Sequence, residues 1–428
     1  MNSRFFKGIT MLIVLSLALS LVFGPMAVAA GNDPIEVTYW YCWTDKIQEN
    51  NINLTQQFND TVGKELGIHV TAEYQGTYDD CHQKLQASFV AGSTPDVVIM
   101  EIASVKTFAE NGVLEPLNPF IEASGVDMDD FFAGLLENCI VGDTWYGMPY
   151  LRSTPLLYMN ATLLEQAGLD ISGPKDYPEF RAYCETLKDK LDVYGLSIPC
   201  DVWFLEGFMF AAGTTILTPD EMQTNINTPE AREMLSFFKS LVDDGLIRVV
   251  AGVDSDKSKA DVMNQKTAMW MTSTADLTYN LAVAAENGYE INTAYFPKNV
   301  TRGVPTGGGN LVMSSIISDD QKQATWEFIN WMTSAEQTAY ASSYTGYVVS
   351  RKSAMDNELM LATYEAKPQF MVALDQLNEC GHGRPMNPGY AEGRVILTSM
   401  MEAIWVNGGD VDTEAAIAEA KINKALDY

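Results

Sequence analysis

Three consecutive glycines, Gly307-Gly308-Gly309, are the first feature of the chain whose type and spacing could support chemistry. Glycine amides can donate hydrogen bonds to a phosphate oxygen or a hydroxyl with no side chain in the way. No Gly-Lys-Ser/Thr follows the glycines, and no Gly-x-Gly-x-x-Gly fingerprint is present. The run therefore predicts a tight turn or a close backbone approach, with a ligand contact as the functional alternative.

Catalytic patterns are absent or uninformative. The sequence has no Gly-x-Ser-x-Gly elbow, and no histidine stands where a Ser-His-Asp arrangement is suggested. His69, His82 and His382 are scattered and show no metal-ligand spacing. The 56 acidic residues supply many carboxylate pairs that a glycosidase could use, so a secreted hydrolase stays a distant alternative. We expect a protein that is not an enzyme and that holds no metal or cofactor.

Aromatic side chains gather near the ends of predicted strands, where they could stack on a sugar or shield a polar ligand from water. Core packing is the competing interpretation for each of them. The residues concerned are Trp40, Trp43, Tyr78, Tyr177, Trp203, Tyr347 and Tyr390.

The formal charge of −29 argues against nucleic acid as a partner, because a groove for a phosphate backbone needs clustered Lys and Arg. Solubility is the simplest explanation of such a charge. An anionic small molecule would meet a repulsive field, so it would need a local cluster of donors.

The first thirty residues read as a secretory signal peptide. Arg4 and Lys7 precede an apolar run over residues 9–23, and small residues follow at 27–30. The run is shorter than the roughly 20 residues of a membrane span. No cysteine stands at a lipidation position, since the first is Cys42. We expect a protein secreted across the cytoplasmic membrane, periplasmic or extracellular.

Six cysteines in an exported chain permit disulfides without specifying them, since about 15 full pairings exist. Cys42 and Cys81 are our weak choice for a bridge.

Strands alternate with helices from residue 36 onward: strands at 37–40, 69–74 and 96–100, helices at 53–66 and 80–91. This order predicts a mainly parallel sheet covered on both faces. Ligands of such sheets bind beyond the carboxyl ends of the strands, where Glu101 stands. Capping of the helix that begins near Ser104 is an equally good explanation of Glu101.

The 428-residue chain exceeds what one hydrophobic core supports, so two lobes are expected. Residues 150–160 read as an extended connector, in which Pro155 suits an edge or interlobe strand. Further crossings are predicted at 289–297 and 346–349, a strand at 267–271, and helices at 178–190, 229–244, 277–287 and 412–426. The predicted organisation is a signal peptide at 1–30, an N-terminal lobe of 31–148 plus 298–345, and a C-terminal lobe of 149–297 plus 346–428.

Several stretches resemble the extracellular solute-binding proteins of ABC transporters, and within them the glycerol-3-phosphate-binding branch. They include Ser-Thr-Pro-Leu-Leu-Tyr-Met-Asn at 153–160, Ala-Gly-Leu-Asp at 167–170, Ala-Gly-Ser-Thr-Pro-Asp at 91–96 and Thr-Gly-Tyr at 345–347. The resemblance covers most of the mature chain. It implies an α/β two-lobe periplasmic-binding-protein-like (type II) fold, in which each lobe is a mainly parallel sheet flanked by helices and a hinge joins the lobes.

The branch resemblance also implies a ligand set on matching positions: Tyr78, Glu101, Ser153, Ser273, Gly308, Tyr347 and Arg394. Arg394 would grip a phosphate bidentately, and Glu101 would accept hydrogen bonds from glycerol hydroxyls. From sequence alone, a surface or interlobe salt bridge is the competing interpretation of Arg394.

The sequence departs from this branch in the second lobe, where Tyr177 replaces a tryptophan and the chain around Trp203 differs. Possible pocket-wall residues are Trp43, Tyr177, Trp203 and Tyr390. We expect a monomeric importer component that binds sn-glycerol 3-phosphate or a glycerophosphodiester and docks on permease subunits. A sugar or oligosaccharide is the alternative solute.

Overall fold

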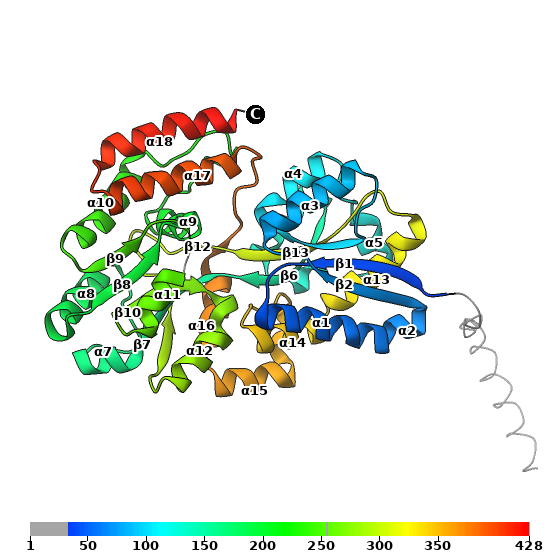
Figure 1. Cartoon of the computed structure of the whole chain (residues 1–428), viewed down its shortest axis with the longest axis horizontal. Helices are drawn as coiled ribbons and strands as arrows, with labels where there is room; N and C mark the ends of the chain where they lie inside the picture. The colour runs from blue at the N-terminus through cyan, green and yellow to red at the C-terminus, as the bar shows by residue number, and fades with distance from the viewer. Residues whose placement is uncertain (1–32, 254–255, 428) are drawn as a thin grey trace, which may run out of the picture. The chain divides into compact units, whose positions relative to one another are not determined.

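The computed structural model describes residues 33–253 and 256–427, so the predicted signal peptide at 1–30 lies outside the described residues. Two five-stranded sheets flanked by helices form the unit from Ile35 onward (Figure 1). The expected α/β class is therefore confirmed. Within the two described ranges, no helix combines the length and the apolar character that a membrane crossing needs.

The first sheet, with its helices, is called the first lobe. Across the sheet the strands are β2 (Ile68–Tyr74), β1 (Ile35–Tyr41), β3 (Val97–Glu101), β13 (Gly307–Met313) and β6 (Gly147–Ser153). Strand β1 runs parallel to β2 and β3, whereas β13 runs antiparallel to both β3 and β6. Its helices are α1 (Asp45–Asp60), α2 (Val62–Leu66), α3 (Tyr78–Val90), α4 (Val105–Glu110), α5 (Asn118–Ser124), α6 (Ala133–Leu136), α13 (Asp319–Met332) and α14 (Ala335–Thr345).

The second sheet forms the second lobe in the same way. Its strands in spatial order are β11 (Ile291–Ala294), β7 (Pro155–Asn160), β10 (Thr267–Ser273), β8 (Tyr194–Pro199) and β9 (Ile247–Val250). Strand β8 runs parallel to β10 and β9, and β7 runs antiparallel to its two neighbours. The helices are α7 (Ala161–Ala167), α8 (Tyr177–Leu191), α9 (Val202–Ala211), α10 (Pro229–Asp243), α11 (Asp256–Met263), α12 (Leu277–Glu286), α15 (Glu358–Ala366), α16 (Gln369–Cys380), α17 (Tyr390–Met401) and α18 (Val411–Leu426).

Short elements join these layers. Strand β12 (Val304–Pro305) pairs with β14 (Gly381–His382), and β4 (Ile140–Val141) pairs with β5 (Thr144–Trp145). The β12–β14 pair brings a late loop beside the segment that leads into the glycine run. The one-turn helices are η1 (Ile102–Ser104), η2 (Met128–Asp130), η3 (Glu137–Cys139), η4 (Thr274–Asp276), η5 (Lys352–Asp356) and the π-type η6 (Glu402–Val406).

In each sheet four of the five strands run the same way and one is reversed, β13 in the first sheet and β7 in the second, so the prediction of mainly parallel sheets is confirmed. Alternating strands and helices identify the elements but leave open the direction of strands that cross between lobes. Pro155 does not mark an edge, because β7 lies between β11 and β10. It is tolerated as the first residue of its strand, where its missing N–H costs no central ladder bond.

Helix α1 begins well before the predicted residue 53, and a break at Thr61 separates it from α2. Its early turns bury amides instead of apolar groups. Tyr39 donates to Asn51 Oδ1 at 2.7 Å, and Asn50 Nδ2 donates to the Tyr150 hydroxyl at 2.9 Å. Because buried amides interrupt the apolar period, the sequence pattern missed these turns.

The chain passes from β6 to β7 at Ser153-Thr154-Pro155 and returns to the first sheet through β12 and β13. The stretch predicted as the second crossing, 289–297, instead supplies β11. The third crossing follows α14, where Val348 N donates to Arg152 O at 2.9 Å. Aromatic cores lie beneath each sheet, around Phe58 and Phe328 in the first lobe and Phe208 and Phe238 in the second.

Candidate functional site

The glycine run on β13 is a close backbone approach at which a side chain would not fit. Gly308 has φ +87°, and a Cβ there would lie 1.9 Å from the carbonyl oxygen of Leu151. A Cβ at Gly307 would lie 2.8 Å from the ring of Trp203 and 2.9 Å from Ser153 Oγ. The run therefore brings Ser153 of the first sheet and Trp203 of the second lobe to one place.

Arg152 holds this strand from behind. Its Nε donates to Gly307 O at 2.9 Å, and its two terminal nitrogens donate to Leu135 O, Asn310 Oδ1 and Thr306 Oγ1 at 2.6–3.0 Å. The side chain is fully buried, and burial lowers its pKa from the usual arginine value. The glycine backbone is thus fixed by a buried guanidinium that uses carbonyl and side-chain oxygens as acceptors.

Tyr78 and Tyr347 meet over the same strand. Their hydroxyls share a hydrogen bond, and burial raises the pKa of both phenols. The Tyr78 hydroxyl lies 3.1 Å from the position that a Cβ on Gly309 would take. A capping box of Thr77 and Asp80 fixes the first turn of α3, and so the place of Tyr78.

Glu101, at the end of β3, both caps a helix and crosses to the other lobe. Its Oε2 accepts from Ala103 N at 3.1 Å and from Ser104 Oγ at 3.2 Å, as the capping interpretation requires. Its Oε1 accepts from Arg384 Nη1 at 3.1 Å. Position alone left capping and ligand binding open for Glu101. In the structure one oxygen caps the helix and the other forms an interlobe ion pair, which the sequence did not predict.

Arg384 binds a second carboxylate on α9. Its Nε and Nη2 donate to Glu206 Oε2 and Oε1 at 3.0 and 2.9 Å, a bidentate pairing. The Tyr390 hydroxyl donates to Glu206 Oε1 at 2.6 Å. Burial alone raises the pKa of Glu101, yet Arg384 and then Arg394 outweigh it and hold that pKa below its usual value.

Arg394 makes no hydrogen bond or ion pair among the described residues. It lines a cavity of about 40 Å³ between the lobes. Its charge is close enough to Glu101 and Asp201 to lower the pKa of both carboxyls, although burial leaves that of Asp201 raised overall. The cavity lining is Ala103, Ser104 and Thr107 from the first lobe, and Pro385, Asn387, Pro388, Tyr390, Ala391 and Arg394 from the second.

The two predicted serines lie on the glycine and tyrosine side of this group. Ser153 is the last residue of β6, opposite Gly307. Ser273 ends β10, and its hydroxyl accepts from Ala275 N at 3.0 Å. No contact among the described residues joins Arg394 to Ser273. Among the predicted ligand residues, Arg394 thus stands apart from those around the glycine run, and its charge acts on Glu101.

Of the four suggested wall residues, Tyr177 is corrected. It is 4% exposed in the core of the second lobe, with its ring stacked on Phe237 at 4.5 Å between centroids. Pro178 follows it at the start of α8, whose apolar face turns Tyr177 inward. Trp203, Tyr390 and Trp43 remain near the site: Trp43 is 37% exposed, with its ring edge-on to Tyr78 at 5.3 Å.

Cys42 and Cys81, the weakly predicted bridge, are both free and buried, and a hydrogen bond joins their thiols. This contact, followed by burial, raises the pKa of the Cys42 thiol. In the described part of the chain, no three His, Cys, Asp or Glu residues gather as metal ligands.

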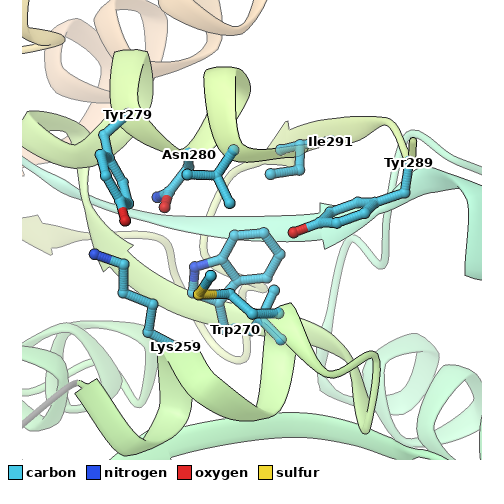
Figure 2. Close-up of a pocket in the computed structure, with 9 residues that line it drawn as sticks. Lys259, Trp270, Tyr279, Asn280, Tyr289 and Ile291 are labelled. Atoms are coloured by element: carbon cyan, nitrogen blue, oxygen red, sulfur yellow. The ribbon is translucent and has the colours of Figure 1, made fainter. Parts of the chain in front are cut away.

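A second cavity, of about 10 Å³, lies between β10, α11 and α12 (Figure 2). Lys259, Trp270, Tyr279 and Asn280 line it, with the Lys259 amine 3.9 Å from the centre of the Tyr279 ring. A space of this size holds about one water. It contains none of the predicted ligand residues, so we do not treat it as the functional site.

Sequence reasoning missed Arg384 and Glu206, the two central charges. The only available signal for Arg384 was an arginine in a Gly- and Pro-rich loop, Gly381 to Pro385. Glu206 stands in the apolar helix α9, where a lone carboxylate that is 2% exposed requires a partner.

Two lobes, each built on a five-stranded sheet, contribute polar and charged side chains to one interlobe site, and this arrangement is typical of two-lobe solute-binding proteins. A family model described as bacterial extracellular solute-binding protein matches residues 53–372, and the chain belongs to that family.

Known relatives agree with this assignment. A putative binding protein of Brucella abortus is 25% identical over 362 residues, covering 82% of this chain and 84% of the relative. The sn-glycerol-3-phosphate-binding periplasmic protein UgpB of Rhizobium meliloti is 23% identical over 371 residues, covering 83% and 84%.

Among solved structures, UgpB from Mycobacterium tuberculosis in complex with glycerophosphocholine has a TM-score of 0.80 at 25% identity, covering 93% of this chain and 99% of that one. The cyclic α-maltosyl-1,6-maltose binding protein of Arthrobacter globiformis has a TM-score of 0.79 at 21% identity, covering 92% and 99%. The two-lobe fold is therefore shared by proteins that bind different solutes.

Proposed function

We propose that this chain is the solute receptor of an ABC importer and binds sn-glycerol 3-phosphate or a glycerophosphodiester between its lobes. The observation that carries the proposal is Arg394, a guanidinium without an ion pair in the described part of the chain, which faces an interlobe cavity. A cation in such a place gains most from an anionic partner, because the low-dielectric surroundings strengthen the pairing.

The rest of the group suits a hydroxylated tail. Glu101 accepts hydrogen bonds, Tyr78 and Tyr347 offer hydroxyls, and the glycine run lets a ligand approach the backbone amide of Gly308. Because Gly308 and Ser153 lie on the sheet, they would bind the solute at fixed positions. Two UgpB proteins among the relatives support the same class of solute.

A sugar or oligosaccharide is the second candidate. Trp43 and Trp203 border the tyrosine and glycine cluster, and aromatic faces of this kind stack on sugar rings. The Arthrobacter structural relative, whose fold this chain shares, is a cyclic α-maltosyl-1,6-maltose binding protein. A neutral solute would contact the aromatic side of the site and would form no ion pair with Arg394.

We further propose that the lobes close around the solute without changing it chemically, and that the closed form docks on permease subunits outside the cytoplasmic membrane. The lobe limit should lie near Thr154 instead of 148/149, because β6 belongs to the first sheet up to Ser153.

Calorimetric titration of the purified mature protein tests the proposal. We expect saturable heat with sn-glycerol 3-phosphate or glycerophosphocholine, no product released after incubation, and a thermal stabilisation of about 2.7 kcal/mol at a hundredfold excess over Kd. Binding of maltose-like sugars with no response to glycerol phosphates would move the assignment to the second candidate. Release of product would make the chain a hydrolase.

A further inference from the structure

One buried arginine has contacts in both lobes and belongs to no predicted ligand set. We propose that Arg384 is a positioning residue that bridges Glu101 and Glu206 and offsets one of their two negative charges, and so keeps Arg394 from being drawn into an ion pair with them and leaves it available to an anionic solute. The part of this inference that concerns the solute rests on the proposed function.

The contacts of the side chain are complete. Arg384 is 8% exposed, and its partners Glu101 and Glu206 are 11% and 2% exposed. Three of its nitrogens donate to the two carboxylates at 2.9–3.1 Å. The carboxylates come from different lobes, so one guanidinium pairs with both, lowers their combined charge from −2 to −1 and joins the lobes at the same time.

The backbone of Arg384 is also held by hydrogen bonds, so the fold itself sets the position of this residue. Its N–H donates to Asn138 Oδ1 and its carbonyl accepts from Asn138 Nδ2, both at 2.8 Å. Gly383 N donates to Glu137 Oε2, and Met386 N donates to Glu221 Oε1. The loop that carries Arg384 is thus tied to both lobes on either side of it.

A charge count shows what Arg384 does for its neighbours. Glu101 and Glu206 contribute two negative charges beside the interlobe cavity, and Arg384 and Arg394 contribute two positive ones. Without Arg384, Arg394 would be the arginine left beside these carboxylates, and its charge already acts on Glu101. Buried carboxylates that lose their cation are strongly destabilising, so Arg394 would be drawn to them and away from a solute.

Other titratable groups face this cluster. Asp201 lies at the start of α9, with a carboxyl pKa that burial raises. Tyr390 keeps its proton because burial raises its pKa, and burial lowers the pKa of His82 on α3. At neutral pH these groups add little positive charge, so they do not replace Arg384.

The test is a double-mutant cycle of Arg384→Gln, Glu206→Gln and the double variant, each titrated with glycerophosphocholine and melted without ligand. Partial charge compensation by Arg384 predicts a loss of roughly 100-fold in affinity and a lower unfolding midpoint for R384Q. E206Q in that background removes one unpaired charge, so both quantities should recover in part. A purely packing role predicts that the double variant is at least as impaired as R384Q, and that result would overturn the proposal.

Arg351→Gln is the matched control. Arg351 is also largely buried, and it pairs with a single carboxylate, that of Asp130. Neither residue lines the interlobe cavity. The substitution should lower the unfolding midpoint and leave solute affinity unchanged. If the wild type binds no glycerol phosphate, the proposed function fails, and the unfolding cycle still decides whether Arg384 offsets the charge of the two carboxylates. Recovery of the midpoint without recovery of affinity would overturn the link to the solute.

Discussion

The two walls of the interlobe site are built differently. The first-lobe wall sits on the sheet and carries one charge, Glu101, beside neutral groups: the glycine run of β13, Ser153 and the Tyr78–Tyr347 pair are held by ladder bonds and by buried Arg152. The second-lobe wall is charged and sits on helices and a loop, with Glu206, Arg384 and Arg394. A rigid wall of mostly neutral groups can serve many hydroxylated solutes, whereas the charges on the opposite wall decide which of them is bound.

Removing the guanidinium of Arg394, which has no ion pair among the described residues, should have the largest effect on solute binding. Arg394→Ala should cost about 4 kcal/mol of binding free energy for a glycerol phosphate, roughly a thousandfold in Kd, because an ionic contact in a desolvated site is lost. Calorimetry gives the Kd values. Val395→Ala, a neighbour that is 67% exposed, is the control and should bind like the wild type. Equal affinity of R394A would show that charge does not select the solute.

A substitution in the glycine run of the first-lobe wall should instead lower the free energy of unfolding. Gly308→Ala should lower the free energy of unfolding by about 3 kcal/mol, since the new Cβ meets Leu151 O and φ is positive. Chemical denaturation measures the loss. Gly67→Ala has a similar positive φ with open space around it, and it should lose only about 1 kcal/mol. Similar losses for the two variants would contradict the close approach.

The tyrosine pair should matter less. Tyr347→Phe removes the hydroxyl that bonds with Tyr78, and we expect a loss of about 1 kcal/mol in solute binding. The loss should be the same for an anionic and a neutral ligand, because the two tyrosine hydroxyls carry no charge. Tyr74→Phe, at a residue that is 45% exposed, serves as the control. If Tyr347→Phe weakened binding of the anionic ligand alone, the different roles assigned to the two walls would be contradicted.

The smallest effect concerns Asp201 on the second-lobe wall. Burial raises the pKa of its carboxyl, so the folded protein holds the proton to higher pH than the unfolded chain, whose pKa is about 3.9. Its contribution to stability is therefore present below that value and is lost as pH rises through the folded pKa.

Asp201→Asn keeps the oxygen that caps Trp203 N and removes this loss. Thermal melts between pH 4 and 8 should show the variant gaining up to about 1 kcal/mol over the wild type toward the upper end. If the variant were more stable than the wild type only near pH 4, the direction assigned to the pKa shift of Asp201 would be wrong.

The sequence predicted the first-lobe wall better than the second-lobe wall, for physical reasons. Strand ends and glycine runs are local signals, so β3 with Glu101 and the approach at Gly308 could be expected from short stretches. Arg384 is placed by the β12–β14 pairing and by Asn138, and these partners are remote along the chain. No local pattern carries that information.

Tyr177 shows the opposite error, in which a family position was carried over without its surroundings. Its ring belongs to an aromatic cluster with Phe237 and Phe238, and core packing is the commoner fate of such a side chain. Strand direction was also beyond local signals, because β7 and β13 reverse direction where the chain crosses between lobes.

A crystal structure of the protein with glycerophosphocholine would test the central claim most directly. The account predicts phosphate oxygens within hydrogen-bonding distance of the Arg394 guanidinium, with Arg384 still joining Glu101 to Glu206. A phosphate bound by Arg384 while Arg394 stays free, or a solute that touches only the aromatic and glycine wall, would contradict it.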